Sequence, residues 1–141
     1  MSKGKLIAIE GLDGSGKATQ AKLLAGYLAA QGLAVREVSF PNYSSDSSAL
    51  VKMYLAGQFG QHPDDVNAYA ASSFYAVDRY ASYKKDWGSF YENGGIVIAD
   101  RYTTSNAVHQ CSNCRRSSGK AFSAGCLILN SICWACPHRM R

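Results

Sequence analysis

A glycine-rich segment near the start of the chain carries the pattern of a phosphate-binding loop. The segment reads G-L-D-G-S-G-K-A-T and directly follows the apolar run Leu6-Ile7-Ala8-Ile9. Glycines at this spacing let the backbone turn tightly, so that successive N–H groups point at phosphate oxygens. Lys17 would reach the β and γ phosphates of a nucleotide, and the dipole of the following helix would strengthen the anion site. The residues assigned to this nucleotide-phosphate site are Gly11, Leu12, Asp13, Gly14, Ser15, Gly16, Lys17, Ala18 and Thr19.

One residue of this loop departs from the usual pattern. Ala18 stands where a serine or threonine hydroxyl normally binds Mg²⁺. Thr19 is the next residue, but one helical step turns its side chain roughly 100° away. Asp100, at the end of a later apolar run, could instead hold the Mg²⁺ shell through water, as a Walker-B acid does.

The elements around the loop predict an α/β fold with a parallel sheet. Residues 17–30 have helical spacing of Leu23, Leu24, Ala25 and Leu28, and residues 34–39 read as a strand. This β-loop-α-β unit predicts a parallel pair with a right-handed crossover. Further helices are expected at 48–56 and 63–85, the latter with Asp64 and Asp65 at its positive end. A buried strand is expected at 96–99, and a helix from Thr103 to His109.

Polar and aromatic residues follow the second and third strands. Phe40-Pro41 ends the second strand, and Asp100-Arg101-Tyr102 ends the third. Ligands of parallel α/β sheets bind at the carboxyl ends of the strands, so these residues are expected to face the loop. Arg101 could grip a phosphate bidentately. A phosphate loop alone leaves ATPases, GTPases and small-molecule kinases open, and these residues favour a second phosphorylated substrate.

Taken together, these motifs resemble thymidylate kinases over roughly residues 3–112. The motifs are Gly11-Leu12-Asp13, Phe40-Pro41, the helical segment from Phe74 to Arg79, and Asp100-Arg101-Tyr102. The resemblance implies a P-loop NTPase-type sheet with flanking helices, ATP and dTMP as substrates, Mg²⁺ with the ATP, and a homodimer. It also implies Lys17, Asp100 and Arg101 as catalytic residues.

The resemblance assigns roles around the acceptor nucleotide. Asp13 would accept a hydrogen bond from the deoxyribose 3′-hydroxyl, and Arg79 would donate to the thymine edge. An aromatic ring one turn earlier would stack on the base; Tyr75, at i−4 from Arg79, is better placed than Phe74. There are two purely structural alternatives. The aromatic ring would belong to the core, and Arg79 would form a surface ion pair with Asp78. The implied acceptor-site residues are Asp13, Phe40, Pro41, Tyr43, Phe74, Tyr75, Arg79, Arg101, Tyr102, Ser105 and Gln110.

Two positions depart from the family pattern. Tyr43 lies where many members carry an arginine for the acceptor phosphate, so the grip on that phosphate would depend more on Arg101. Gly14 occupies the loop position at which some members place a catalytic arginine. Members with glycine there supply arginines from a later lid segment, which would lie beyond residue 112.

The bulk properties fit one globular domain without a nucleic-acid or membrane role. The 141-residue chain is 47% hydrophobic and carries a formal net charge of +5. Basic and acidic side chains balance up to Gln110, and the excess comes from the acid-free tail: Arg115, Arg116, Lys120, Arg139 and Arg141. No apolar stretch is long enough to span a membrane and no signal-peptide pattern begins the chain, so a cytoplasmic location is expected.

The tail from residue 113 does not resemble the family, and it has two main competing interpretations besides that of a genuine unrelated tail. Cys111-x-x-Cys114 and Cys133-x-x-Cys136 have zinc-ribbon spacing, with Cys126 and His138 as spare ligands, which would make a non-enzymatic zinc-binding module. Alternatively, the loss of one base at the Asn113 codon would read residues 113–141 out of frame. Restoring that base gives an amphipathic, family-like segment, and sequencing the gene at this codon distinguishes the two.

The sequence therefore predicts residues 1–112 as the N-terminal part of a P-loop kinase domain, truncated after its third strand. A P-loop deoxynucleoside kinase is the enzymatic alternative, because it would share the loop without needing Arg101 for an acceptor phosphate. We also expect the 141-residue chain to be poorly stable and weakly active or inactive. The third strand would lack its neighbours, and apolar faces of the sheet would be exposed.

Overall fold

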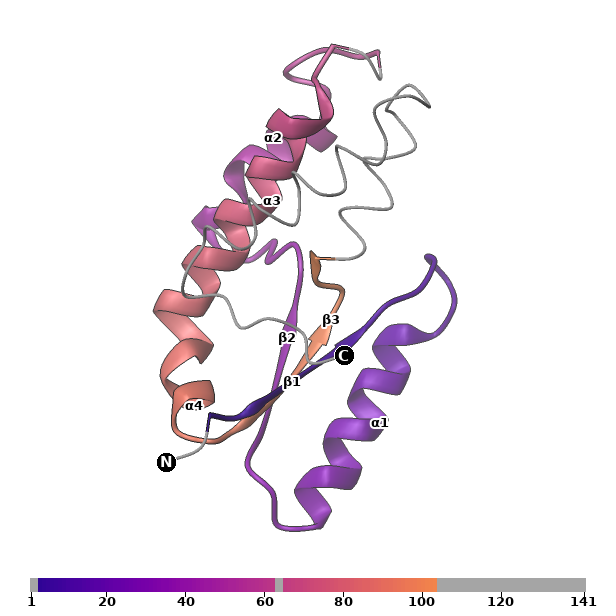
Figure 1. Ribbon diagram of the computed structural model, residues 1–141. Coiled ribbons are helices and arrows are strands. Elements are labelled where there is room, and N and C mark those ends of the chain that lie inside the picture. Colours follow the sequence, from indigo (N-terminus) through magenta and orange to yellow (C-terminus); the bar gives the residue numbers. More distant parts are fainter. Residues whose placement is uncertain (1–2, 63–64, 104–141) are drawn as a thin grey trace, which may run out of the picture.

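Three parallel strands form the sheet that carries the glycine-rich loop (Figure 1). The structure, a computed structural model, describes residues 3–62 and 65–103. The strands are β1 (Lys5–Ile9), β2 (Val35–Ser39) and β3 (Ile96–Asp100), and their order in the sheet is β1-β3-β2. The predicted α/β class with a parallel sheet and flanking helices is confirmed.

The order of the strands corrects two expectations. β1 and β2 are parallel but are not paired with each other, because β3 lies between them and pairs with both. β3 consequently does not lack neighbours: its three middle residues, Val97, Ile98 and Ala99, are fully buried. The edges without a strand partner in the described part of the chain are the outer edges of β1 and β2. The half-buried side chains of β1 are consistent with that edge position.

Helices cover both faces of the sheet (Figure 1). On one face, α1 (Lys17–Ala30) packs Ala21 and Ala25 against Ile98, with Leu24 and Leu28 at the margin. Leu23, expected on the buried face, is 62% exposed. It lies one helical step away from the stripe that runs through positions 21, 24, 25 and 28, and that step turns it toward solvent.

On the opposite face of the sheet, an aromatic core lies between the strands and the remaining helices. A 3₁₀ turn, η1 (Asp46–Ser48), leads into α2 (Ala49–Leu55), close to the helix expected at 48–56. α3 (Ala68–Ser82) continues through a π-helical turn, η2 (Tyr83–Trp87), into α4 (Gly88–Glu92). The buried members of this core are Phe40, Tyr83, Trp87, Tyr91, Val97, Ala99 and Tyr102.

The start of α3 differs from the helix expected from residue 63. The helix begins at Ala68 because Asn67 caps it, its side-chain oxygen accepting a hydrogen bond from the Ala70 N–H at 2.9 Å. Asp65 lies before the helix and accepts from the His62 N–H at 2.9 Å, so it does not act at the positive helix end. Pro63 and Asp64 lie outside the described residues.

Several predictions concern residues for which the structure gives no description. Ser105, Gln110, the helix expected over 103–109 beyond its first residue, all five cysteines and the segment 113–141 are among them. Within the described ranges, none of the helices is both long and apolar enough to cross a membrane.

Candidate active site

The carboxyl ends of the three strands lie level with one another and bring three loops together. Ile9 and Ser39 are both in register with Asp100. Two further backbone bonds extend the ladders beyond the strands: the Phe40 N–H donates to the Asp100 carbonyl at 3.1 Å, and the Arg101 N–H donates to the Ile9 carbonyl at 3.0 Å. The loops after β1, β2 and β3 therefore meet at one edge, as the sequence predicted for a ligand site.

The glycine-rich loop has the backbone shape that its glycines predict. Gly14 and Gly16 have φ of 77° and 80°, a region that other residues rarely adopt, and the Ser15 N–H donates to the Leu12 carbonyl at 3.2 Å. Gly16 is the N-cap of α1 and has no side chain to accept from the first turn, which also contains no acidic residue. The positive end of α1 is thus available to an external anion.

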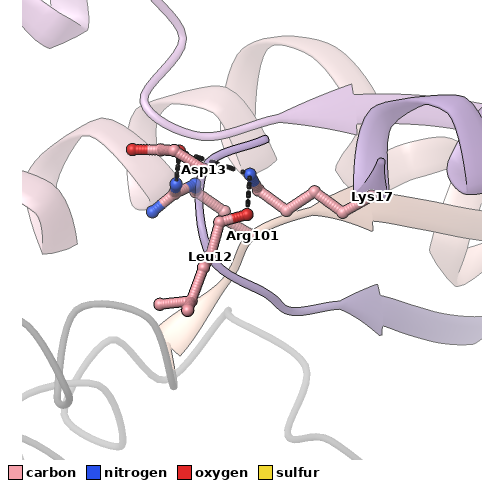
Figure 2. Close-up of polar contacts among 4 residues, drawn as sticks. All are labelled: Leu12, Asp13, Lys17 and Arg101. Atoms are coloured by element: carbon pink, nitrogen blue, oxygen red, sulfur yellow. Dashed lines mark hydrogen bonds and ion pairs between the residues drawn. The ribbon is translucent and has the colours of Figure 1, made fainter. Parts of the chain in front are cut away.

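Lys17 and Arg101 converge on one carboxylate, that of Asp13 (Figure 2). Lys17 Nζ lies 3.4 Å from Asp13 Oδ1 and 3.4 Å from the Leu12 carbonyl oxygen. Arg101 Nη2 donates to the same Oδ1 from the tip of β3. The Lys17 and Arg101 side chains are 11% and 19% exposed, whereas that of Asp13 is 87% exposed. Two cations thus face one exposed anionic position at the edge of the sheet.

The charges around Asp13 give a pH-dependence that can be measured. Arg101, assisted by Lys17, holds the pKa of Asp13 below its ordinary value of 3.8. A carboxylate with a lowered folded-state pKa stabilises the fold above its unfolded pKa, and this contribution is lost as pH falls through the folded-state value. We expect the urea midpoint of unfolding to be higher for wild type than for Asp13→Asn. The difference should be constant between about pH 5 and 8, because Asp13 stays ionised there. The margin should close only below pH 3.8; closure near neutral pH would show that a different group controls it.

Asp100 lies beside Ala18 at a small pocket. Its Oδ1 is buried and has no hydrogen-bond partner among the residues that the structure describes. Ala18, Ser39 and Asp100 help to line this pocket, which measures about 190 Å³. A buried carboxylate oxygen with unused acceptor capacity is costly unless something binds it, and oxygen ligands suit hard cations. The arrangement fits the predicted role of Asp100 toward a hydrated divalent cation.

Arg101 is held in a strained backbone conformation. Its φ is 65°, and no other described residue except glycine has a positive φ. On either side the chain is fixed, since the Arg101 N–H bonds the end of β1 and the Tyr102 N–H donates to Glu10 Oε1 at 3.0 Å. Strain of this kind costs of the order of 1–3 kcal/mol and is typical of functional sites. Here it directs the guanidinium back across the glycine-rich loop.

The residues predicted for the acceptor side come mainly from α3 and from the loop after β2. Burial raises the pKa of Tyr75 to about 12, with Tyr43 and Tyr54 adding to the effect and Arg101 opposing it. Of the residues that influence this pKa, Tyr43 and Arg101 belong to the predicted acceptor site. The Phe74 ring packs 5.5 Å from that of Phe59 and 6.2 Å from that of Tyr54, between centroids.

The base of this side is built from buried residues. The Phe40 and Tyr102 rings are about 5% and 4% exposed and pack edge to face, with centroids 5.7 Å apart, so both support the site from the core. Arg79 is 2% exposed and its guanidinium carbon lies 5.8 Å from the centre of the Tyr102 ring. The alternative of a surface ion pair for Arg79 is therefore wrong. Pro41 follows a cis peptide bond and lies beside the exposed Tyr43.

Two carboxylates at the site were not predicted from the sequence. Glu10, directly before Gly11, fixes the Tyr102 N–H. Asp78, directly before Arg79, is 1% exposed and bonds the loop after β2. Each carboxylate directly precedes a predicted site residue, and this was the signal in the sequence that could have indicated it. The hydrogen-bond partner of each carboxylate is distant along the chain, so its contact could not be predicted.

The first strand of the parallel sheet leads through a glycine-rich loop of the phosphate-binding type into a helix. This arrangement places the chain among the P-loop α/β proteins. More narrowly, the chain belongs to the thymidylate kinase family: the family model "Thymidylate kinase" matches residues 9–118. The family predicted from the motifs is thus confirmed.

Individual relatives and solved structures agree with this assignment. A thymidylate kinase of Mycobacterium tuberculosis is 35% identical over 118 residues, which make up 82% of this chain and 54% of that protein. One of Plasmodium falciparum is 30% identical over 128 residues, 91% of this chain and 52% of that protein. The structure of thymidylate kinase from Candida albicans matches with a TM-score of 0.64 and 28% identity, over 96% of this chain and 57% of that one. The chain thus spans about half the length of the relatives it matches.

Proposed function

We propose that this chain carries the donor and acceptor phosphate sites of an enzyme that transfers the γ-phosphoryl group of ATP to dTMP. The observation that supports it most directly is the convergence of Lys17 and Arg101 on Asp13 Oδ1. Lys17 belongs to the loop that would hold ATP, and Arg101 belongs to the strand tip that would hold the acceptor. Transfer requires the two phosphates to meet in line, and these cations already flank one anionic position.

The chain's own residues would act mainly by positioning and charge neutralisation. The loop amides and the start of α1 would bind the ATP phosphates, and Lys17 would draw the γ-phosphate toward the acceptor. Arg101 would bind the dTMP phosphate, while Tyr75 and Arg79 would face the base and Asp13 the sugar. Both cations must exchange Asp13 for phosphate oxygens on substrate binding. Mg²⁺, bound with ATP, would neutralise phosphate charge, and Asp100 would hold its water shell.

A comparison of acceptors tests this function. We would incubate the full 141-residue chain with radiolabelled ATP and Mg²⁺, and supply either dTMP or thymidine as acceptor. Label in dTDP and none in dTMP supports the proposal. Phosphorylation of thymidine in preference to dTMP favours the deoxynucleoside kinase. Because the chain covers about half of its relatives, equilibrium binding of each ligand is measured in parallel; failure to bind ATP or dTMP would contradict the proposal without requiring turnover.

The missing hydroxyl at Ala18 predicts a change in Mg²⁺ dependence. Ala18→Ser places a hydroxyl at the pocket shared with Asp100, so it should lower the Mg²⁺ concentration needed for half-maximal ATP binding by about threefold, the effect of one modest ligand. The measurement is ATP titration across a Mg²⁺ series. Ala29→Ser makes the same change on the exposed last turn of α1 and should match wild type. An equal Mg²⁺ requirement in all three proteins would contradict the assignment of this pocket.

We further infer a cytoplasmic protein and, by family resemblance, one that acts as a homodimer. Sedimentation equilibrium of the purified chain tests the second point, since a monomer at all concentrations would contradict it.

A further inference from the structure

Asp78 is a buried carboxylate of α3 that bonds a different part of the chain with both of its oxygens. It is 1% exposed. Oδ2 accepts from the Asn42 N–H at 2.8 Å, and Oδ1 accepts from the Ser47 hydroxyl at 2.6 Å. A carboxylate is costly to bury without partners, whereas hydrogen bonds to a charged group are among the stronger ones in proteins. Both partners lie on the loop that follows β2.

The bonds from Asp78 continue into a network that shapes this loop. A carboxylate can only accept, so the Ser47 hydroxyl donates its hydrogen bond to Asp78, and its oxygen can accept from the Ser45 hydroxyl, 2.9 Å away. The Ser45 hydroxyl oxygen caps η1 by accepting from the Ser47 N–H at 3.3 Å, and the Ser45 N–H donates to the Asn42 carbonyl at 3.0 Å. Asp78 thereby fixes the loop at two points, one directly after Pro41 and one at η1.

The two segments joined by Asp78 are the two walls of the proposed acceptor site. α3 carries Tyr75 and Arg79, the latter adjacent to Asp78 in the chain. The loop carries Pro41 and Tyr43, on either side of the bonded Asn42. Any change in the bonds of Asp78 therefore alters the position of Pro41 and Tyr43 relative to α3. The glycine-rich loop is attached to the sheet through β1 and does not bond Asp78 in the described structure.

We propose that Asp78 is a positioning residue that ties the loop of residues 40–48 to α3 and thereby sets the affinity for the acceptor nucleotide. It does not touch the substrate; it acts through Asn42 and Ser47. The inference rests on the proposed function for the identity of the acceptor, dTMP. The tie itself is independent of that function, because it is defined by the contacts of Asp78 alone.

Two measurements on the full chain test the tie and its consequence. Hydrogen–deuterium exchange of the peptides covering 40–48 and 11–19 reports the local opening of each segment. Equilibrium titration with dTMP and, separately, with ATP reports the two sites. For Asp78→Asn and Ser47→Ala we expect faster exchange at 40–48, unchanged exchange at 11–19, and dTMP affinity about tenfold weaker for one lost charged hydrogen bond. ATP affinity should stay within about twofold, since its phosphates bind elsewhere.

A matched control variant and a milder variant separate the loss of the loop contacts from a general loss of charge or of folding. Asp65→Asn removes the same charge but affects a bond to the His62 N–H, outside the loop of residues 40–48, so it should leave both the 40–48 exchange and dTMP binding at wild-type values. If Asp78→Asn unfolds, Ser47→Ala decides the question, because it removes the hydroxyl bonds of Ser47 to Asp78 and Ser45 but leaves the bond between Asp78 and the Asn42 N–H. Wild-type exchange at 40–48 in both variants, or faster exchange with unchanged dTMP affinity, would overturn the inference. Absence of dTMP binding by wild type would instead count against the proposed function, and the exchange data would still decide whether Asp78 ties the loop.

Discussion

Replacing Lys17 with alanine should remove most of the chain's affinity for ATP and abolish any phosphoryl transfer. Lys17 is the cation of the glycine-rich loop, and its ammonium lies 3.4 Å from the Asp13 carboxylate, which Arg101 also contacts. Loss of a charge-assisted contact to phosphate corresponds to a decrease in affinity of roughly 10- to 100-fold. In transfer the effect is larger, because charge on the γ-phosphate must also be stabilised in the transition state. ATP titration followed by single-turnover assay measures both.

The matched control for this variant is Lys52→Ala. Lys52 is an exposed lysine of α2, away from the loop, so its removal changes net charge equally but no phosphate contact. Thymidine or dTMP binding should be nearly unchanged in Lys17→Ala, because the proposed acceptor site lies between α3 and the loop after β2. ATP affinity at the wild-type level in Lys17→Ala would refute the assignment of the loop.

Features set by neighbouring residues could be predicted from the sequence. α1 runs from Lys17 to Ala30, the bounds expected, because the glycines before it fix the turn and Gln31-Gly32 ends it. The strand ends at Ser39 and Asp100 were likewise identified, because Phe40-Pro41 breaks the pattern after Ser39 and the apolar run before Asp100 stops there. Parallel packing then forces Arg101 to face the loop, so the central cluster of the site could be derived from local signals and one topological rule.

Features set by distant partners could not be predicted in this way. Nothing within β1 or β2 indicates that β3 inserts between them, because pairing depends on the whole sheet. Asp78 reads as a helix-surface acid by composition, yet the loop of residues 40–48 covers it and supplies its two donors. The positive φ of Arg101 is similar: it follows from bonds to Ile9 and Glu10, far earlier in the chain.

Replacing Arg101 should damage acceptor binding while sparing donor binding. Arg101→Ala removes the guanidinium that faces Asp13, so dTMP affinity should fall by roughly 10- to 100-fold, as expected for a bidentate phosphate contact. Thymidine, which has no phosphate, should bind wild type and variant alike. Arg101→Lys keeps the charge without the planar fork and should give an intermediate dTMP affinity. Equal dTMP affinity in Arg101→Ala and wild type would contradict the assignment of the acceptor phosphate.

A glycine at the same position separates this binding role from the backbone strain. Arg101 adopts φ of 65°, which costs an alanine of the order of 1 kcal/mol and a glycine almost nothing. Arg101→Gly and Arg101→Ala should therefore show the same loss of dTMP affinity, while Arg101→Gly has the higher free energy of unfolding by about 1 kcal/mol in urea titrations. Equal stabilities would mean that the loop relaxes to negative φ once the side chain is gone. In that case the contact with Asp13, more than the bonds of Ile9 and Glu10, would be what maintains the strained turn.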